Sequence, residues 1–302
     1  MNRLPFAPPP QLLIALVAIC LAASAARAQD PAANQAPAAA APQPAQPARP
    51  AAQPAPNPDN AWMAKANKLY YSSTRAGLTG FDCTIHPDWH TVFVSANKGK
   101  TVADDDAGIA LLKTVNITLH ARMSGGSTID WVAPSSPDKP LDKGSTDLLD
   151  GMHQGIQQVL EGFMQFWTPF VDGSAVPDSA EGLEITHTPT VHTIHVKQGD
   201  TEVTEILSKD LVLEQFNVTL KGASIKVTPA YKPTAQGLLV NGFVAHILPA
   251  GAAPSQAQDM TVGIEYQALG GLTIPRQVNI DVVGSGTFNL ALDSCTTNPK
   301  PN

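Results

Sequence analysis

The longest apolar pattern in the chain covers residues 145–171 and has the period of a helix. Apolar side chains recur there at steps of three and four residues, which places them on one helix face. Ser145 or Thr146 is expected to cap this helix. Thr168-Pro169 is expected to end or kink it, because proline disfavours helical geometry at the residue before it. A helix with so broad an apolar stripe is expected to lie against a sheet.

Most of the chain after residue 182 alternates apolar and polar side chains with the two-residue period of a strand. Each alternating segment is expected to form an antiparallel strand with one buried face and one wet face. The alternation is clearest in residues 216–220, 260–266, 278–282 and 288–292.

A sheet of many strands that each have one apolar face must curve and cover that face with another element. The helix predicted in residues 145–171 could cover the apolar face of the sheet, and a helix predicted within residues 59–77 is a second candidate. The pattern therefore predicts a mainly β (α+β) fold: a strongly curved antiparallel sheet, or half-barrel, with helices packed in its concave side. Residues 59–302 are expected to form this single domain.

The first 28 residues have the layout of a secretory signal peptide. Arg3 precedes an apolar run over residues 12–23, and small residues lead to a cleavage site after Ala28. The run is short for a membrane span, which needs roughly 20 residues. An uncleaved anchor and a lipid on Cys20 are the alternatives. The pattern predicts a periplasmic or secreted protein.

Residues 29–58 consist almost wholly of alanine and proline. Such a segment cannot bury enough apolar surface to offset its ordering entropy, and its prolines favour extended geometry. At ~3.1 Å per residue it would reach on the order of 90 Å. We therefore predict a disordered tether between the signal peptide and the folded domain.

Removal of the signal peptide leaves two cysteines, Cys83 and Cys295, near the two ends of the folded domain. In an oxidising compartment an even pair is typical of a disulfide, and two buried thiols are the alternative. A bond requires the two Cα atoms to lie within ~7 Å of each other. The pair therefore predicts that the first strand and the end of the chain lie side by side.

Charge and motifs argue against nucleic-acid binding and catalysis. The net charge is −7 and the basic residues are scattered, so no nucleic-acid partner is expected. The sequence contains no G-x-S-x-G elbow and no glycine-rich phosphate loop between a strand and a helix. We expect no enzymatic activity and no cofactor.

Histidines are the remaining candidates for metal ligands. His187 and His192 are expected to face each other across a hairpin, with His195 on the other face. Zinc would need at least one more ligand, and no cysteine or acid stands at a matching spacing. The sequence therefore predicts no metal site, and the histidines are interpreted as polar residues at strand ends.

The segment from Tyr266 to Pro275, Tyr-Gln-Ala-Leu-Gly-Gly-Leu-Thr-Ile-Pro, closes a recognisable order of elements. A helix, a few strands, a helical insertion and a long meander precede it. This order resembles the periplasmic outer-membrane lipoprotein carriers and their lipid-binding relatives, over roughly residues 59–292. The resemblance implies an open barrel whose apolar cavity is lidded by helices and carries acyl chains between membranes.

One cluster on the predicted central helix could serve a function. It is either plain core or the wall of a cavity, where methionines and large aromatics suit an apolar ligand of variable shape. The candidate ligand-binding residues are Met152, Ile156, Val159, Leu160, Phe163, Met164, Phe166, Trp167 and Phe170.

The leading hypothesis is an exported, non-enzymatic carrier or binding protein for an acyl chain or a lipidated partner. Its expected partners are a lipid-like ligand and possible contacts with a membrane or envelope lipoproteins. The alternative is an envelope structural or interaction module with a fully packed core and no ligand, displayed on the Ala/Pro tether.

Overall fold

The computed structural model describes residues 57–96, 101–103, 105–123, 126–134, 141–173 and 175–299. The predicted signal peptide and nearly all of the predicted tether lie outside the described residues. The described part is mainly β, as the alternation predicts, and its strands form one antiparallel sheet of 12 strands.

The sheet is a long meander whose last strand pairs with its first. The strands are β1 (Leu78–Pro87), β2 (Asn116–Arg122), β3 (Ser127–Val132), β4 (Glu184–His187), β5 (Val191–Gln198), β6 (Thr201–Ser208), β7 (Leu213–Leu220), β8 (Ala223–Thr234), β9 (Gly237–Leu248), β10 (Gln258–Leu269), β11 (Leu272–Val282) and β12 (Gly286–Pro299). Their spatial order is β3-β2-β1-β12-β11-β10-β9-β8-β7-β6-β5-β4. Within the described residues β3 and β4 are therefore the two edges, and the sheet is not closed.

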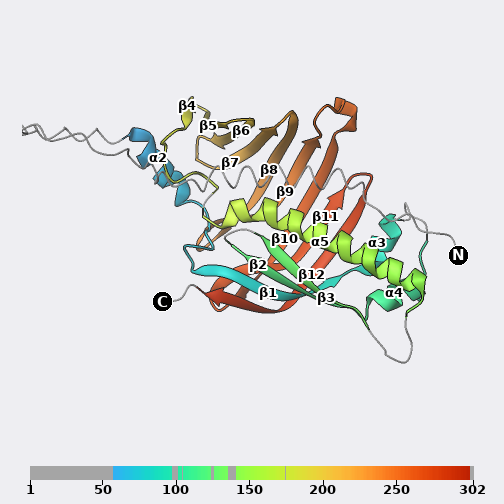
Figure 1. The fold of residues 1–302 in the computed structure, drawn as a ribbon. Helices are drawn as coiled ribbons and strands as arrows, with labels where there is room; N and C mark the ends of the chain where they lie inside the picture. The colour runs from blue at the N-terminus through green and yellow to red at the C-terminus, as the bar shows by residue number, and fades with distance from the viewer. Residues whose placement is uncertain are drawn as a thin grey trace, which may run out of the picture.

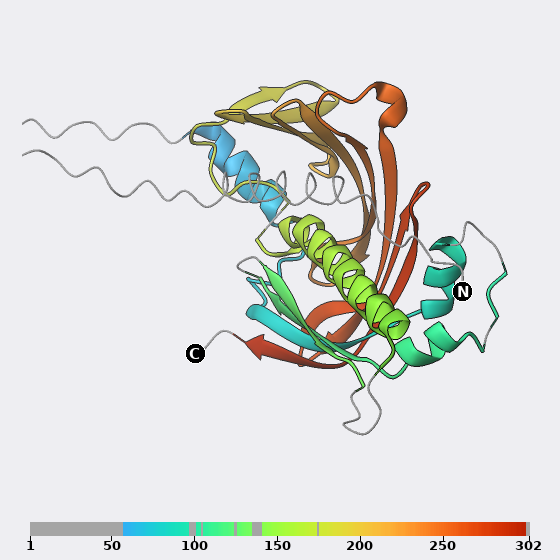
Figure 2. The same cartoon turned by 45° about the vertical axis from the view of Figure 1, so that its right-hand side comes forward.

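The helices of the described residues are α2 (Pro58–Asn67), α3 (Trp89–Ala96), α4 (Ala107–Leu112) and α5 (Lys143–Val171), with a short 3₁₀ turn η1 (Pro254–Gln256). Figure 1 places α3 and α4 near the start of α5, and α2 near its end. Figure 2 shows α5 passing between strands β1–β3 and strands β4–β9. Among the described helices, none combines the length and the apolar character needed to cross a membrane.

The central helix α5 is slightly longer than the sequence predicts. The predicted caps Ser145 and Thr146 are wrong, because the carboxylate of Asp142 accepts the backbone N–H of Ser145 at 2.9 Å. Pro169 does not end the helix at Thr168 either, since α5 continues to Val171. Pro169 lies in the last turn of α5, so little helix follows the backbone hydrogen bond that its nitrogen cannot donate.

The predicted first helix is shorter than expected. Asn57 caps α2, and α2 ends at Asn67, so residues 68–77 form an extended and turn-rich segment rather than helix. This segment buries Tyr70 and Tyr71 almost completely. Their hydroxyls bond to strand and turn atoms far along the chain, and such long-range contacts override local helix propensity.

Aromatic contacts show how α5 joins distant parts of the sheet. The Trp167 ring lies 6.1 Å from that of Phe81 on β1. Phe166 lies 5.6 Å from Phe243 on β9, and Phe170 contacts Phe216 on β7. One helix therefore contacts strands that are widely separated in the sheet order, and its apolar stripe is part of the core.

Candidate functional site

The predicted ligand-binding cluster lies on the face of α5 that meets the sheet. All of its residues are buried except Val159, which is partly buried and packs against the others. Phe163 and Trp167 stack with their ring centroids 5.9 Å apart. In this structure the cluster is filled by its own side chains and those of the strands around it.

A short hydrogen-bond chain fixes the largest fully buried side chain of this cluster, Trp167. Trp167 Nε1 donates to the Tyr266 hydroxyl at 2.9 Å, and that hydroxyl donates to the carbonyl of Val240. Burial raises the pKa of Tyr266, so the hydroxyl stays protonated and available as a donor. An apolar ligand that enters here must either leave these two hydrogen bonds intact or break them.

Residues 68–77 cross the end of α5 and tie it to the sheet. The Tyr70 hydroxyl donates to the carbonyl of Leu211 at 2.9 Å and accepts the N–H of Leu213 at 2.6 Å. Ser73 Oγ donates to the carbonyl of Val171 at 2.7 Å. The sequence offered no signal for these contacts, because Tyr70 fits the apolar spacing of a helix equally well.

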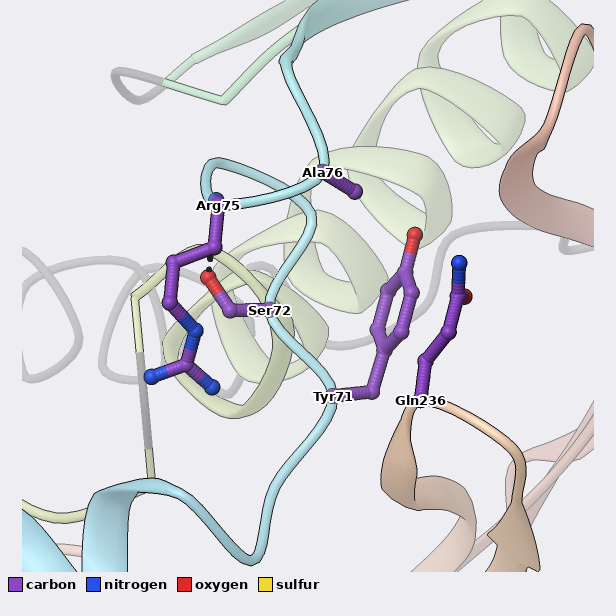
Figure 3. Close-up of a pocket in the computed structure, with 5 residues that line it drawn as sticks. All are labelled: Tyr71, Ser72, Arg75, Ala76 and Gln236. Atoms are coloured by element: carbon purple, nitrogen blue, oxygen red, sulfur yellow. Dashed lines mark hydrogen bonds between the residues drawn. The ribbon is translucent and has the colours of Figure 1, made fainter.

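A pocket of about 210 Å³ opens beside this crossing and is drawn in Figure 3. Arg75 Nη2 donates to the carbonyls of Asn67 and Tyr70, at 3.1 and 2.6 Å, so its guanidinium holds the turn after α2. Figure 3 shows the Tyr71 and Gln236 side chains beside each other at the right of the view, and Ser72 and Arg75 at the left. The lining residues are Tyr71, Ser72, Arg75, Ala76 and Gln236.

His187 and His192 face each other across the β4–β5 hairpin, as predicted, and are register partners. Their Nδ1 atoms lie 2.8 Å apart, and His187 Nε2 lies 3.0 Å from Asp59 Oδ1 on α2. Burial and the neighbouring His187 lower the pKa of His192. Among the described residues, no three His, Cys, Asp or Glu side chains converge as a set of metal ligands.

The predicted disulfide is confirmed. Cys83 on β1 is bonded to Cys295 on β12, and their Cα atoms are 4.1 Å apart. The pairing of β1 with β12 shifts register here, because Asp82 pairs with Thr296 while Thr84 pairs with Asp293. Two residues of β12 therefore oppose Cys83, as in a β-bulge.

A carboxylate–histidine network crosses strands β1, β2 and β3. His120 Nδ1 lies 2.8 Å from Asp82 Oδ1, and its Nε2 lies 3.1 Å from Asp130 Oδ2. Hydrogen bonds to Asp82 and then to Asp130 raise the pKa of His120. Although burial acts to raise it, hydrogen bonds from His120 and Arg122 help hold the pKa of Asp82 below its usual value.

This network predicts a pH-dependent contribution to stability. A histidine whose folded pKa is raised contributes fully below its unfolded value, about 6.5, and loses the contribution as pH rises through the folded pKa. We therefore expect His120→Gln to lower stability by up to about 1 kcal/mol near pH 5.5, since the pair is partly exposed. The loss should nearly vanish by about pH 9. Calorimetric melting of both proteins across this range measures it, and an equal loss at both ends would contradict the assignment.

No protein-family model, curated protein or solved structure matches this chain.

Proposed function

We propose that this protein is an exported, non-enzymatic carrier or binding protein for an apolar ligand of the acyl-chain type. In this proposal the sheet is a strongly curved half-barrel with α5 in its concave side, and the ligand takes the space next to the aromatic stripe of α5. The sequence resemblance to periplasmic lipoprotein carriers is consistent with this proposal.

The observation that carries the proposal is an open sheet whose distant strands contact one apolar helix. Side chains of β1, β7 and β9 reach α5, and the edges β3 and β4 are not joined to each other. In this proposal the sheet widens at its unjoined edges while every strand pair between the edges is retained. Widening would separate α5 from the strands and expose apolar surface to a ligand.

In this proposal the ligand enters at the pocket lined by residues of the segment 71–76 and by Gln236. The pocket lies on the segment that binds the end of α5 through Ser72 and Ser73, which donate to the carbonyls of Asp172 and Val171. Tyr71 gives the pocket an aromatic wall, and Arg75 gives it a positive charge. An amphiphile with an anionic head group would match both features.

The second candidate is a ligand-free structural or interaction module. The near-complete burial of the α5 cluster favours it, because Phe163, Met164 and Trp167 are each no more than 3% exposed. A core this densely packed already provides a stable fold without a ligand.

Titration with a fluorescent fatty acid distinguishes the two candidates. The carrier proposal expects saturable binding by the wild-type protein, and Phe163→Ala should change the affinity by about tenfold, since it alters the volume of an apolar site by a whole ring. Val244→Ala is the matched control. Val244 neighbours Phe243 on β9 but is 47% exposed, so it should leave binding unchanged.

Each outcome decides between the candidates. Saturable binding that shifts in a folded Phe163→Ala protein supports the carrier. Absence of saturable binding by the wild type, together with a sharply destabilised Phe163→Ala protein, supports the packed module. The thermal midpoint is measured on the same samples, so loss of fold and loss of binding are read separately.

A further inference from the structure

We propose that His187 and His192 form a binding site for a divalent transition-metal ion, with Cu²⁺ preferred over Zn²⁺. The site lies on the β4–β5 hairpin at one edge of the sheet, where α2 packs against it. It is independent of the apolar interior and of the ligand proposed for it.

The two imidazoles already face each other across adjacent strands. His187 and His192 are cross-strand partners, and their Nδ1 atoms are 2.8 Å apart. Two ring nitrogens at this distance share one proton in the metal-free state. A metal ion would bind through the lone pairs of both nitrogens. For this, the proton on His192 Nδ1 moves through solvent to Nε2 of the same ring. Both ligands therefore remain neutral imidazoles.

Asp59 sets the tautomer that such a site needs. Its Oδ1 lies 3.0 Å from His187 Nε2, so that nitrogen carries the proton and Nδ1 keeps its lone pair. A carboxylate on the far nitrogen of a ligating histidine also orients the ring and raises its basicity. Asp59 therefore acts in the second coordination shell, and water completes the first.

The nitrogen separation favours copper. For metal–nitrogen bonds of about 2.0 Å, neighbouring ligands lie about 2.8 Å apart at a right angle but about 3.3 Å apart at the tetrahedral angle. The two Nδ1 atoms are 2.8 Å apart in the metal-free hydrogen bond, so rings that turn both lone pairs toward one ion could bind tetragonal Cu²⁺ without moving the nitrogens apart. Copper also binds nitrogen ligands most tightly among the divalent first-row metals.

The surroundings leave the site accessible and give it an optical reporter. The side chain of His187 is 40% exposed, so an ion and its waters can reach the nitrogens. The Trp62 ring lies 5.1 Å from both imidazole rings. Bound Cu²⁺ is expected to quench the fluorescence of an indole this close.

The sequence could not supply this arrangement. It placed the histidines opposite each other but offered no acid at matching spacing. Asp59 stands 128 positions before His187 and reaches it only because α2 folds onto the hairpin. A bound ion would therefore strengthen the sheet edge and its link to α2.

The test titrates CuSO₄ and, separately, ZnSO₄ into the mature chain without an affinity tag. The wild type is expected to bind Cu²⁺ more tightly than Zn²⁺, to show nitrogen hyperfine splitting by electron paramagnetic resonance, and to lose Trp62 fluorescence. His187→Ala and His192→Ala should each abolish the nitrogen signal and the quenching. Asp59→Asn should weaken binding on the order of 10- to 100-fold.

His246→Ala is the matched control. His246 is also an exposed strand histidine beside a carboxylate, Asp259, but has no histidine opposite it, so Cu²⁺ binding should be unchanged. Circular dichroism checks that each variant is folded. Binding that survives both His187→Ala and His192→Ala, or absence of saturable Cu²⁺ binding by the wild type, would overturn the site. Tighter binding of Zn²⁺ would overturn the preference for copper.

Discussion

Replacing Cys83 and Cys295 with serine is expected to lower the free energy of unfolding by up to about 5 kcal/mol. The bond closes a loop with a sequence separation of 212 residues, so its absence greatly enlarges the set of unfolded conformations. Urea denaturation of the oxidised wild type and the double-serine variant measures the difference.

The folded structure of the variant should change little. β1 and β12 remain paired on both sides of the bulge, with Phe81 opposite Thr297 and Ile85 opposite Leu292. Far-ultraviolet circular dichroism should therefore be unchanged below the transition. The wild type with its bond reduced is the control and should unfold at the midpoint of the variant. A wild type with two alkylatable thiols before reduction would contradict the bond itself.

The sequence predicted the strands well, because each has one face in the core and one in water. Met260, Val262 and Ile264 alternate with Thr261 and Glu265, and the structure buries the apolar set. The parity of the cysteines predicted that the first strand and the end of the chain lie together, and the Cys83–Cys295 bond confirms it. The alternation of apolar and polar residues thus predicted the fold class, and the cysteine pair predicted that β1 and β12 are neighbours.

The candidate sites were harder to predict, because their partners come from distant parts of the chain. Tyr70 had the spacing of a helical residue, yet its hydroxyl bonds to Leu211 and Leu213. Asp59 fell at the start of a predicted helix, yet it bonds His187. Hydrogen bonds of this range leave no period in the sequence, so only the fold reveals them.

Replacing Trp167 with alanine is expected to cost about 3–5 kcal/mol of stability, because it removes a large side chain that is 1% exposed. Two effects add to the lost burial. Phe163 and Phe81 lose the ring they contact, and the Tyr266 hydroxyl loses the indole donor at 2.9 Å. Chemical denaturation followed by circular dichroism measures the loss.

Matched variants separate the ring from its hydrogen bond. Trp167→Phe keeps an aromatic ring and removes the N–H, so it should cost much less than Trp167→Ala. Tyr266→Phe leaves the indole N–H and the Val240 carbonyl without their partner and should cost about 1–3 kcal/mol. Because the two side chains are bonded to each other, the double variant should cost less than the sum of the single changes. Strict additivity would contradict the hydrogen bond. A Trp167→Ala protein as stable as the wild type would contradict the close packing of Trp167 in the interior.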